Sequence, residues 1–260
     1  MNLVAELEFA LELAEIADRV TMAGFRSADL QVSTKPDMTP VSEADRDVER
    51  LLREHIAEHR SGHAVVGEEF GTSGSAEWTW IIDPIDSTKN YVRGIPVFAT
   101  LIALTRDDRA EVGVVTSPAM DRRWWAAREH GAFMNGEPIR VSAVSQVEDA
   151  QLSINSLLDF DKHGIGPGGR QLSERCWRTR GFGDFWSHVL VAEGGVDIAA
   201  EPVVSVWDLA ALQVIVEEAG GRFTDFGGRS TYAGGSAIST NGLLHDAVLE
   251  LLGSGSNHDV

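Results

Sequence analysis

The chain has 260 residues, of which 43% are hydrophobic and 24% charged, a composition typical of a globular enzyme with one large domain or two fused halves. Its formal net charge of −18 at pH 7 repels polyanions, which excludes nucleic acid and anionic membranes as partners. A phosphate ester would therefore bind only beside bound cations. Cys176 is the single cysteine, and no signal peptide or membrane span is evident, so we expect a protein of the reducing cytoplasm.

The N-terminal segment is predicted to form two helices. Apolar residues recur on one face over residues 3–24, which predicts an amphipathic helix. Ser42 is a suitable N-cap for a second helix through about residue 60, and it places Asp45 in the first turn. Three histidines follow the i, i+4, i+8 spacing of a transition-metal site, namely His55, His59 and His63. Their charged surroundings and the lack of further ligands favour a surface helix without metal.

Two short apolar runs, 64–67 and 80–82, are predicted to be strands separated by a Gly/Ser loop over 71–77. The first leads to Glu68 and Glu69, and the second leads to Asp83 and Asp86. Pro84 lies between the two aspartates and should hold them on a stiff turn. Facing carboxylates repel each other unless a cation lies between them, and hard oxygen ligands suit Mg²⁺. An acidic turn without metal is the simpler interpretation of this motif alone.

Ser87 and Thr88 directly follow the acidic pair and are predicted to start a helix with their hydroxyls as caps. The first N–H groups of a helix have no helical partner and favour a phosphate. One turn could therefore hold a metal and a phosphate side by side.

Residues 97–128 alternate apolar and polar side chains, which predicts two or three antiparallel strands with a turn over 118–121. Asn135-Gly136 is a strong hairpin signal. Trp124 and Trp125 are interpreted as core or interface residues.

From about residue 145 the pattern changes to alternating strands and helices. The predicted strands are 150–156, 196–200, 222–226 and 236–240, and the predicted helices are 184–193, 208–219 and 243–252. The loop 164–169 matches G-x-G-x-x-G by letter, but Pro167 and the absence of a preceding apolar strand argue against a dinucleotide site. Asp208 begins an apolar helix, where an ordinary N-terminal residue is the simpler interpretation.

The order of these motifs is more specific than any one of them. Val41-Ser42-x-x-Asp45, Gly67-Glu68-Glu69, the run from Asp83 to Thr88, and Trp207-Asp208 followed by Glu218-Ala219-Gly220-Gly221 together resemble the inositol monophosphatase family of Mg²⁺-dependent phosphatases. The resemblance covers nearly the whole chain. It implies a layered α/β/α/β/α sandwich, a homodimer, a small phosphorylated substrate and two or three Mg²⁺ ions per site. We expect the two halves, 1–145 and 146–260, to form one compact catalytic unit.

The resemblance also implies roles for individual residues. The metal ligands of the family correspond here to Glu68, Asp83, the backbone carbonyl of Ile85, Asp86 and Asp208. Water activation corresponds to Glu68 and Thr88, with Asp45 orienting the threonine, and the backbone N–H groups of Ser87 and Thr88 correspond to the phosphate site. The metal ions would activate a water and neutralise the phosphate, while the protein would mainly position the reacting groups.

This chain departs from the family pattern at two places near the phosphate site. Ser87 stands where the family usually has glycine, so the closest backbone approach to the phosphate is expected to differ. In the first motif, which begins at Lys35, Thr39-Pro40 precedes Val41-Ser42 where Asp-Leu is common, so the pattern gives less support to a third metal site near that loop.

The segment from Arg180 to Phe185 occupies the substrate-facing place in the family. Its Gly183-Asp184 pair looks like the histidinol-phosphate phosphatase branch, since a carboxylate suits an ammonium and an imidazole better than a neutral polyol. Glu201 matches another position that faces the substrate, while Asp184 could equally be a helix N-cap. The predicted activity is hydrolysis of histidinol phosphate in histidine synthesis. An inositol-1-phosphate or 3′-nucleotide bisphosphate phosphatase and a non-catalytic binding protein are the alternatives, and the intact acidic set disfavours the last.

Overall fold

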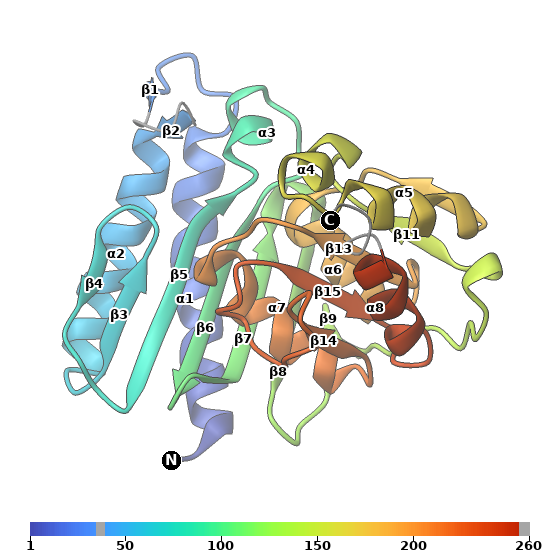
Figure 1. The fold of residues 1–260 in the computed structure, drawn as a ribbon. Helices are drawn as coiled ribbons and strands as arrows, with labels where there is room; N and C mark the ends of the chain where they lie inside the picture. Colours follow the sequence, from blue (N-terminus) through green and yellow to red (C-terminus); the bar gives the residue numbers. More distant parts are fainter. Residues whose placement is uncertain (35–39, 255–260) are drawn as a thin grey trace.

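The computed structural model describes residues 1–34 and 40–254, which form alternating layers of helices and sheets (Figure 1). Two helices cover one face of a large sheet, two more fill the space between this sheet and a smaller one, and three close the far side. The predicted α/β/α/β/α sandwich is thus confirmed. Lys35 and Thr39, near which the third metal was considered, lie outside the described residues.

The outer helices are α1 (Leu3–Gly24) and α2 (Glu43–His59), at the bounds that the sequence predicts. Side chains at helical spacing on α1, among them Phe9, Leu13 and Ala17, are buried against the large sheet. Burial of this apolar stripe, more than helix propensity, stabilises such a helix. Ser42 and Asp45 form a capping box that starts α2.

The large sheet has, among the described residues, eight strands in the order β10-β9-β8-β7-β6-β5-β3-β4. The pair β3–β5 is parallel and the other pairs are antiparallel. Their bounds are β3 Ala64–Gly67, β4 Gly71–Ser73, β5 Trp78–Asp86, β6 Ala99–Arg106, β7 Arg109–Ser117, β8 Arg122–Ala127, β9 Ala132–Met134 and β10 Glu137–Pro138. The predicted antiparallel strands over 97–128 are confirmed as β6, β7 and β8, and so are the Asn135-Gly136 hairpin and the burial of Trp124.

The central layer consists of α6 (Asp184–Ala192) and α7 (Val206–Glu218). Helix α7 is apolar on nearly every side because it packs against β6 and β7 of the large sheet and β14 and β15 of the small one. Gly113 on β7 allows this close approach, since a Cβ there would lie 2.5 Å from the carbonyl oxygen of Ala211. The middle of α7 is therefore fixed between the two sheets, which places its N-terminus at their common edge.

The small sheet has five strands among the described residues, in the order β12-β11-β13-β15-β14. Its strands are β11 Gln151–Ser153, β12 Arg178–Arg180, β13 Ile198–Glu201, β14 Arg222–Thr224 and β15 Ala237–Thr240. Helices α4 (Leu157–Lys162), α5 (Gly166–Arg175) and α8 (His245–Ser254) cover its outer face. The remaining short elements are β1 Val32–Thr34, β2 Pro40–Ser42, α3 Thr88–Val92 and the 3₁₀ turns Pro118–Met120 and Val147–Asp149.

Several sequence-based expectations were wrong. The Gly/Ser loop over 71–77 contains strand β4, and the glycine-rich segment 164–169 is not a loop but runs into α5. Helix α4 and strand β12 were not predicted. The acidic strand does not stop at Ile82 but continues as β5 to Asp86.

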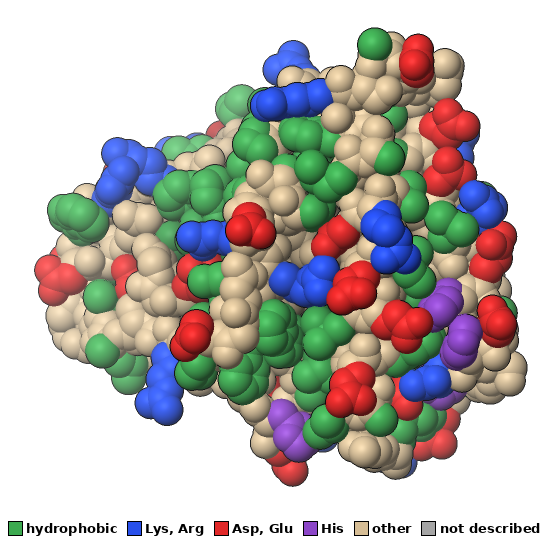
Figure 2. Space-filling model, turned by 180° about the vertical axis from the view of Figure 1, so that it is seen from behind, with side chains coloured by type: hydrophobic (Ala, Val, Ile, Leu, Met, Phe, Trp, Pro, Cys, Tyr) green, Lys and Arg blue, Asp and Glu red, His purple; other side chains and the backbone are tan. Residues whose placement is uncertain are grey.

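Of the described helices, none is both long and apolar enough to cross a membrane. On the back of the molecule, Lys and Arg side chains are scattered among Asp and Glu and do not gather in one basic patch (Figure 2).

Candidate active site

The end of strand β5 brings Asp83 and Asp86 into the site. Its pairing with β6 is regular up to Asp83 and shifts before Asp86, so the two aspartates lie on an irregular strand end and not on a separate turn. Thr100 Oγ1 donates to the Pro84 carbonyl at 2.7 Å and fixes the backbone between them. Asp83 and Ile85 are buried, at 2% and 0% exposure. Pro84 is compatible with this position because the register shift removes the need for a regular hydrogen bond.

Glu68 reaches the same place because β3 runs parallel to β5, with Gly67 opposite Ile82. The Glu68 N–H donates to the Ile82 carbonyl at 3.3 Å. The fully buried Glu49 of α2 accepts from the backbone N–H groups of Glu69 at 2.7 Å and Phe70 at 3.2 Å. Gly67 is needed for this contact, since a Cβ would lie 2.0 Å from Glu49 Oε1. Glu49 therefore holds the acidic loop, a role that no sequence motif indicated.

Asp45 and Thr88 are hydrogen-bonded to each other. Asp45 Oδ2 accepts from the Ser42 N–H at 2.8 Å and from Ser42 Oγ at 2.5 Å, which leaves Oδ1 to accept from Thr88 Oγ1 at 3.3 Å. Thr88 Oγ1 also contacts the carbonyl of Ile85 at 2.9 Å. Burial raises the pKa of Asp45 to about 6, with smaller contributions from the charges of Glu69 and Glu68. The geometry agrees with the predicted orientation of Thr88 by Asp45.

Ser87 occupies the N-cap position of α3 in the left-handed conformation, with φ +65°. Its hydroxyl does not cap the helix as predicted. It donates instead to the carboxylate of Asp184 at the start of α6. The side chain therefore joins residues that are far apart in the sequence.

Asp208 enters the site from the first turn of α7. Its Oδ2 accepts from the Ser205 N–H at 2.7 Å in a second capping box, and its carboxyl lies near that of Asp83. Burial raises the pKa of Asp208 to about 7, and the charges of Glu68 and Glu201 add to the effect. The residue thus lies in the first turn of the helix, as the simpler interpretation held, and also belongs to the acidic cluster.

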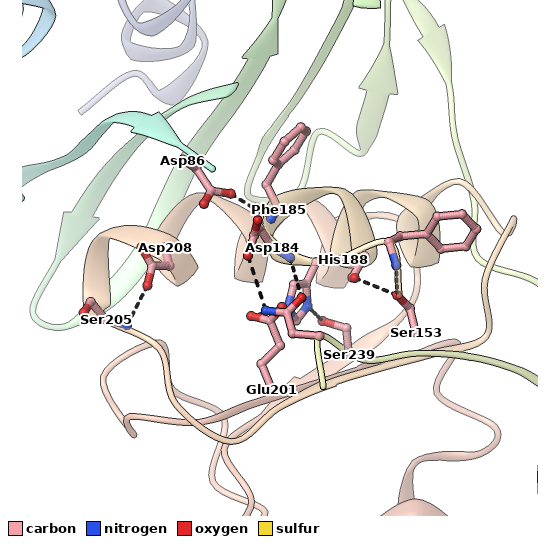
Figure 3. Close-up of polar contacts among 12 residues, drawn as sticks. Asp86, Ser153, Asp184, Phe185, His188, Glu201, Ser205, Asp208 and Ser239 are labelled. Carbon is pink, nitrogen blue, oxygen red and sulfur yellow. Dashed lines mark hydrogen bonds and ion pairs between the residues drawn. The ribbon is translucent and has the colours of Figure 1, made fainter. Parts of the chain in front are cut away.

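A small cavity of about 100 Å³ is lined by Asn155, Phe185 and four carboxylates. The carboxylates belong to Asp86, Asp184, Glu201 and Asp208 (Figure 3). The Phe185 N–H donates to Asp86 Oδ2 at 2.7 Å. Burial raises the pKa of Asp86 well above its ordinary value, and the charges of Asp184 and Asp208 raise it further. A larger cavity of about 300 Å³ lies beside Val66 and Tyr232, but its acidic side chains, Glu77, Asp107 and Asp108, are exposed and not buried.

The acidic cluster has the donor chemistry of a divalent-cation site. Burial raises the pKa of Asp83 well above its ordinary value, and the negative charges of Glu68, Asp86 and Asp208 raise it further. Within the described ranges, the buried Asp83 Oδ1 has no hydrogen-bond partner. No three metal-binding side chains of the described residues stand in a ready-made ligand arrangement. Mutually repelling carboxylates are expected to converge only around a cation, and hard oxygen ligands suit Mg²⁺.

The substrate-facing residues predicted from the sequence are only partly brought together. Asp184 is the first residue of α6 and Gly183 holds the N-cap position, so the alternative of Asp184 as N-cap is wrong. Burial raises the pKa of Asp184. The hydrogen bonds from Ser87 and Asn155 and the charge of Lys89 lower it, but the effect of burial is larger. Arg180 is exposed on β12, where its Nη1 donates to the carbonyl of Thr179 at 2.9 Å, and it does not line the cavity.

His188, a residue that sequence reasoning missed, lies beside Glu201 (Figure 3). His188 is fully buried, with Nδ1 hydrogen-bonded to Ser239 Oγ at 2.6 Å and Nε2 3.6 Å from Glu201 Oε2. A histidine inside an apolar helix gave no signal of such a contact.

Among the described residues, the three histidines at helical spacing make different contacts, and His63 lies beyond the end of α2. His55 Nε2 is 3.0 Å from Glu12 Oε1, whereas His63 Nδ1 accepts from Trp80 Nε1 at 3.1 Å. His55 also stacks on Phe9. The interpretation of a surface helix without metal agrees with these separate contacts.

A layered α/β sandwich with buried carboxylates from several layers at one edge defines a class of candidate metal-dependent hydrolases. The model of the inositol monophosphatase family matches residues 3–256, and the chain belongs to this family. A histidinol-phosphatase of Mycobacterium tuberculosis is 52% identical over 258 residues, which cover 96% of this chain and 98% of that protein.

Two solved structures show the same fold. An IMPase of Thermotoga maritima is 32% identical, with a TM-score of 0.85 and coverage of 96% of this chain and 98% of its own. An IMPase/NADP phosphatase complexed with Mg²⁺ and phosphate is 21% identical, with a TM-score of 0.83 and coverage of 100% and 97%. The second likeness is evidence for the fold alone.

Proposed function

We propose that this protein is a metal-dependent phosphomonoesterase that hydrolyses L-histidinol phosphate to L-histidinol and phosphate. The observation that carries the proposal is the 52% identity to a histidinol-phosphatase over nearly the full length of both chains. The site adds a chemical reason, because Asp184 and Glu201 line the same cavity as two of the candidate metal ligands, Asp86 and Asp208. A substrate with a phosphate at one end and a cationic group at the other matches this arrangement.

Glu68, Asp83, the carbonyl of Ile85, Asp86 and Asp208 are the proposed ligands of two or three Mg²⁺ ions. Bound Mg²⁺ supplies a more acidic water and neutralises the charges of the phosphate and the leaving oxygen. The unpartnered Asp83 Oδ1 and the raised pKa values of Asp83 and Asp86 support this assignment among the described residues.

Thr88 and Glu68 are the proposed groups that orient and deprotonate the attacking water. Asp45 Oδ1 accepts the hydrogen bond of Thr88, which fixes the rotamer of the threonine hydroxyl. The backbone N–H groups of Ser87 and Thr88 are the proposed phosphate contacts. Together these groups hold the phosphorus in line with the water, and positioning of this kind supplies much of the rate in phosphoryl transfer.

Asp184 and Glu201 are proposed to bind the cationic end of the substrate, while Gly183 gives the substrate close access to the backbone. Arg180, which does not line the cavity, has no part in this proposal. Hydrogen bonds between charged partners are stronger than those between neutral ones. The homodimer, the division into halves near residue 145 and the cytoplasmic location stay predictions.

Phosphate release from a panel of monoesters, with Mg²⁺ and with EDTA, tests the proposed function. We expect Mg²⁺-dependent turnover with the highest kcat/KM for histidinol phosphate. Preference for inositol 1-phosphate or a 3′-nucleotide bisphosphate would replace the substrate assignment. Absence of turnover on every ester would favour a non-catalytic role.

Asp184→Asn tests the substrate contact directly. This change keeps the shape of the side chain and removes its charge. We expect kcat/KM for histidinol phosphate to fall about tenfold to hundredfold more than that for glycerol 2-phosphate, the equivalent of a charged hydrogen bond of about 1.5–3 kcal/mol. Equal losses on both esters would show that Asp184 does not read the cationic end.

A further inference from the structure

Two neighbouring residues of the site have a backbone conformation that ordinary side chains rarely adopt. Ser87 has φ +65° and Asp184 has φ +50°, and neither is glycine. Such conformations cost free energy and persist where the surrounding structure holds them. The two residues come from different sheets and helices, yet the Ser87 hydroxyl donates directly to Asp184 Oδ2. Both residues joined by this hydrogen bond adopt an unfavourable backbone conformation, which indicates that the contact is functionally important.

Asn155, which follows strand β11, holds Asp184 from the other side. Its Nδ2 donates to Asp184 Oδ1 at 3.3 Å, and its Oδ1 accepts from the Asp184 N–H at 3.1 Å. A Cβ at Gly183 would lie 2.6 Å from Asn155 Oδ1, so the glycine leaves room for this pair of contacts. Both oxygens of the Asp184 carboxylate are thus bonded, one to each neighbour.

We propose that Ser87 and Asn155 are positioning residues that fix the direction of the Asp184 carboxylate and thereby set the selectivity of the site for phosphate esters with a cationic group. The inference rests on the proposed function and adds how the Asp184 carboxylate is oriented toward the cationic group of the substrate. A carboxylate free to rotate would lose rotamer entropy when it binds a cation, whereas a carboxylate held on both oxygens has already lost it. The remaining lone pairs then face the cavity that Asn155 and Asp184 line together.

The position of Ser87 makes this coupling specific to the residue present. Glycine would adopt φ +65° more easily than serine and could present the same backbone N–H to a phosphate. The serine hydroxyl is the part that glycine lacks, and it contacts the group proposed to recognise the cation. The backbone and the side chain of Ser87 would therefore serve opposite ends of one substrate.

Ser87→Gly and Asn155→Ala test the proposal, with kinetics on histidinol phosphate and glycerol 2-phosphate. We expect each variant to lower the ratio of the two kcat/KM values about threefold to tenfold, mainly through KM for histidinol phosphate, the size of one lost hydrogen bond. Ser87→Gly should keep or raise the melting temperature, because glycine relieves the positive φ. Ser156→Ala removes a small polar group one residue from Asn155, bonded to the Leu158 N–H and not to Asp184, and should leave the ratio unchanged.

The double variant Ser87→Gly/Asp184→Ala separates positioning from a direct effect. If Ser87 acts through Asp184, Ser87→Gly changes the ratio no further once Asp184 is alanine. An unchanged ratio in both single variants, or full additivity in the double variant, would overturn the inference while leaving the proposed function intact. A wild type without preference for histidinol phosphate would instead overturn the proposed function.

Discussion

At the scale of single residues, several carboxylates of the site carry out two tasks. Asp45 and Asp208 each complete a capping box through one oxygen, and the other side of each carboxylate faces the acidic cluster. A capping contact of this kind contributes about 1 kcal/mol to a helix. Substitution at these two positions therefore mixes loss of activity with loss of stability. Asp86 and Thr88 are better probes of chemistry, since neither belongs to a capping box.

Asp86→Asn should abolish turnover and leave the fold intact. Asparagine keeps the volume and one oxygen that can accept from the Phe185 N–H, but it removes the charge of a proposed Mg²⁺ ligand. We expect kcat/KM to fall by about 10³-fold or more, the equivalent of several kcal/mol of transition-state stabilisation. Circular dichroism and thermal unfolding check the fold. Wild-type turnover that persists in EDTA would contradict the metal assignment.

Thr88→Ala should lower kcat and leave KM close to that of the wild type, because the hydroxyl is proposed to orient water and not to hold substrate. The expected loss is about 10²-fold, typical of one group in proton transfer. Asp45→Asn should add little to it in the double variant if the two residues act as a unit. A change confined to KM would identify Thr88 as a binding group.

At the scale of elements, patterns that repeat along the chain were predictable and single tertiary contacts were not. The apolar stripe of α1, the alternation in β6 to β8 and the capping signal of α2 were all visible in the sequence. Helix α5 was missed because its glycine-rich start resembles a loop. Gly168 and Gly169 permit close packing instead, since Cβ atoms there would lie 2.6 Å from the Leu252 carbonyl and 2.5 Å from the Phe160 ring. Packing overrides helix propensity at this point.

The site shows the same division between local and distant information. The candidate metal ligands lie in short motifs whose order could be matched to a family. Glu49, Asn155 and His188 have no motif, because each acts through a contact with a residue remote in the sequence. The Ser87 hydroxyl was assigned to the wrong partner for the same reason. The local sequence predicted that this hydroxyl caps α3, whereas in the folded chain it donates to the Asp184 carboxylate.

Gly113→Ala tests the contact that fixes α7 between the sheets. The added methyl would lie 2.5 Å from the Ala211 carbonyl oxygen and 2.6 Å from Val214 Cγ1, so β7 and α7 must separate. We expect destabilisation of about 1–3 kcal/mol, measured by denaturant unfolding. Gly62→Ala is the matched control, because a Cβ there has no atom within 4 Å among the described residues, and its stability should stay within about 0.5 kcal/mol of the wild type.

At the scale of the whole molecule, the acidic cluster joins layers that are far apart in the sequence. Asp83 and Asp86 come from the large sheet, whereas Asp184 and Asp208 come from the helices behind it. Like charges at this junction oppose folding, and a bound cation would offset them. The effect should be visible in the dependence of stability on pH and Mg²⁺.

The metal-free protein should become more stable as the pH falls from about 8 to 5. Burial raises the folded-state pKa of Asp208 from 3.8 to about 7 and that of Asp45 to about 6, so between pH 4 and 7 the folded state holds protons that the unfolded state releases. The free energy of unfolding therefore increases as the pH is lowered through this window.

Magnesium should reverse this trend, because metal binding needs deprotonated carboxylates. The rise in melting temperature on adding Mg²⁺ should be larger at pH 8 than at pH 6, by on the order of 1 kcal/mol in stability for each proton displaced per pH unit. Differential scanning calorimetry with EDTA and with Mg²⁺ at both pH values measures it. A shift that is equal at both pH values, or larger at pH 6, would contradict the prediction.

The two capping boxes influence which acidic residues an inactive descendant of such an enzyme would retain. A chain that had lost its catalytic role would still need Asp45 and Asp208 to begin α2 and α7, so selection for folding alone could preserve both. Asp83 is different, because its carboxyl is buried, lies close to other acids of the cluster and, in the described part of the chain, has one oxygen without a partner. An apolar or amide side chain there would relieve the folded state once metal was no longer bound. Asp83 is therefore the position at which drift away from catalysis would first become visible.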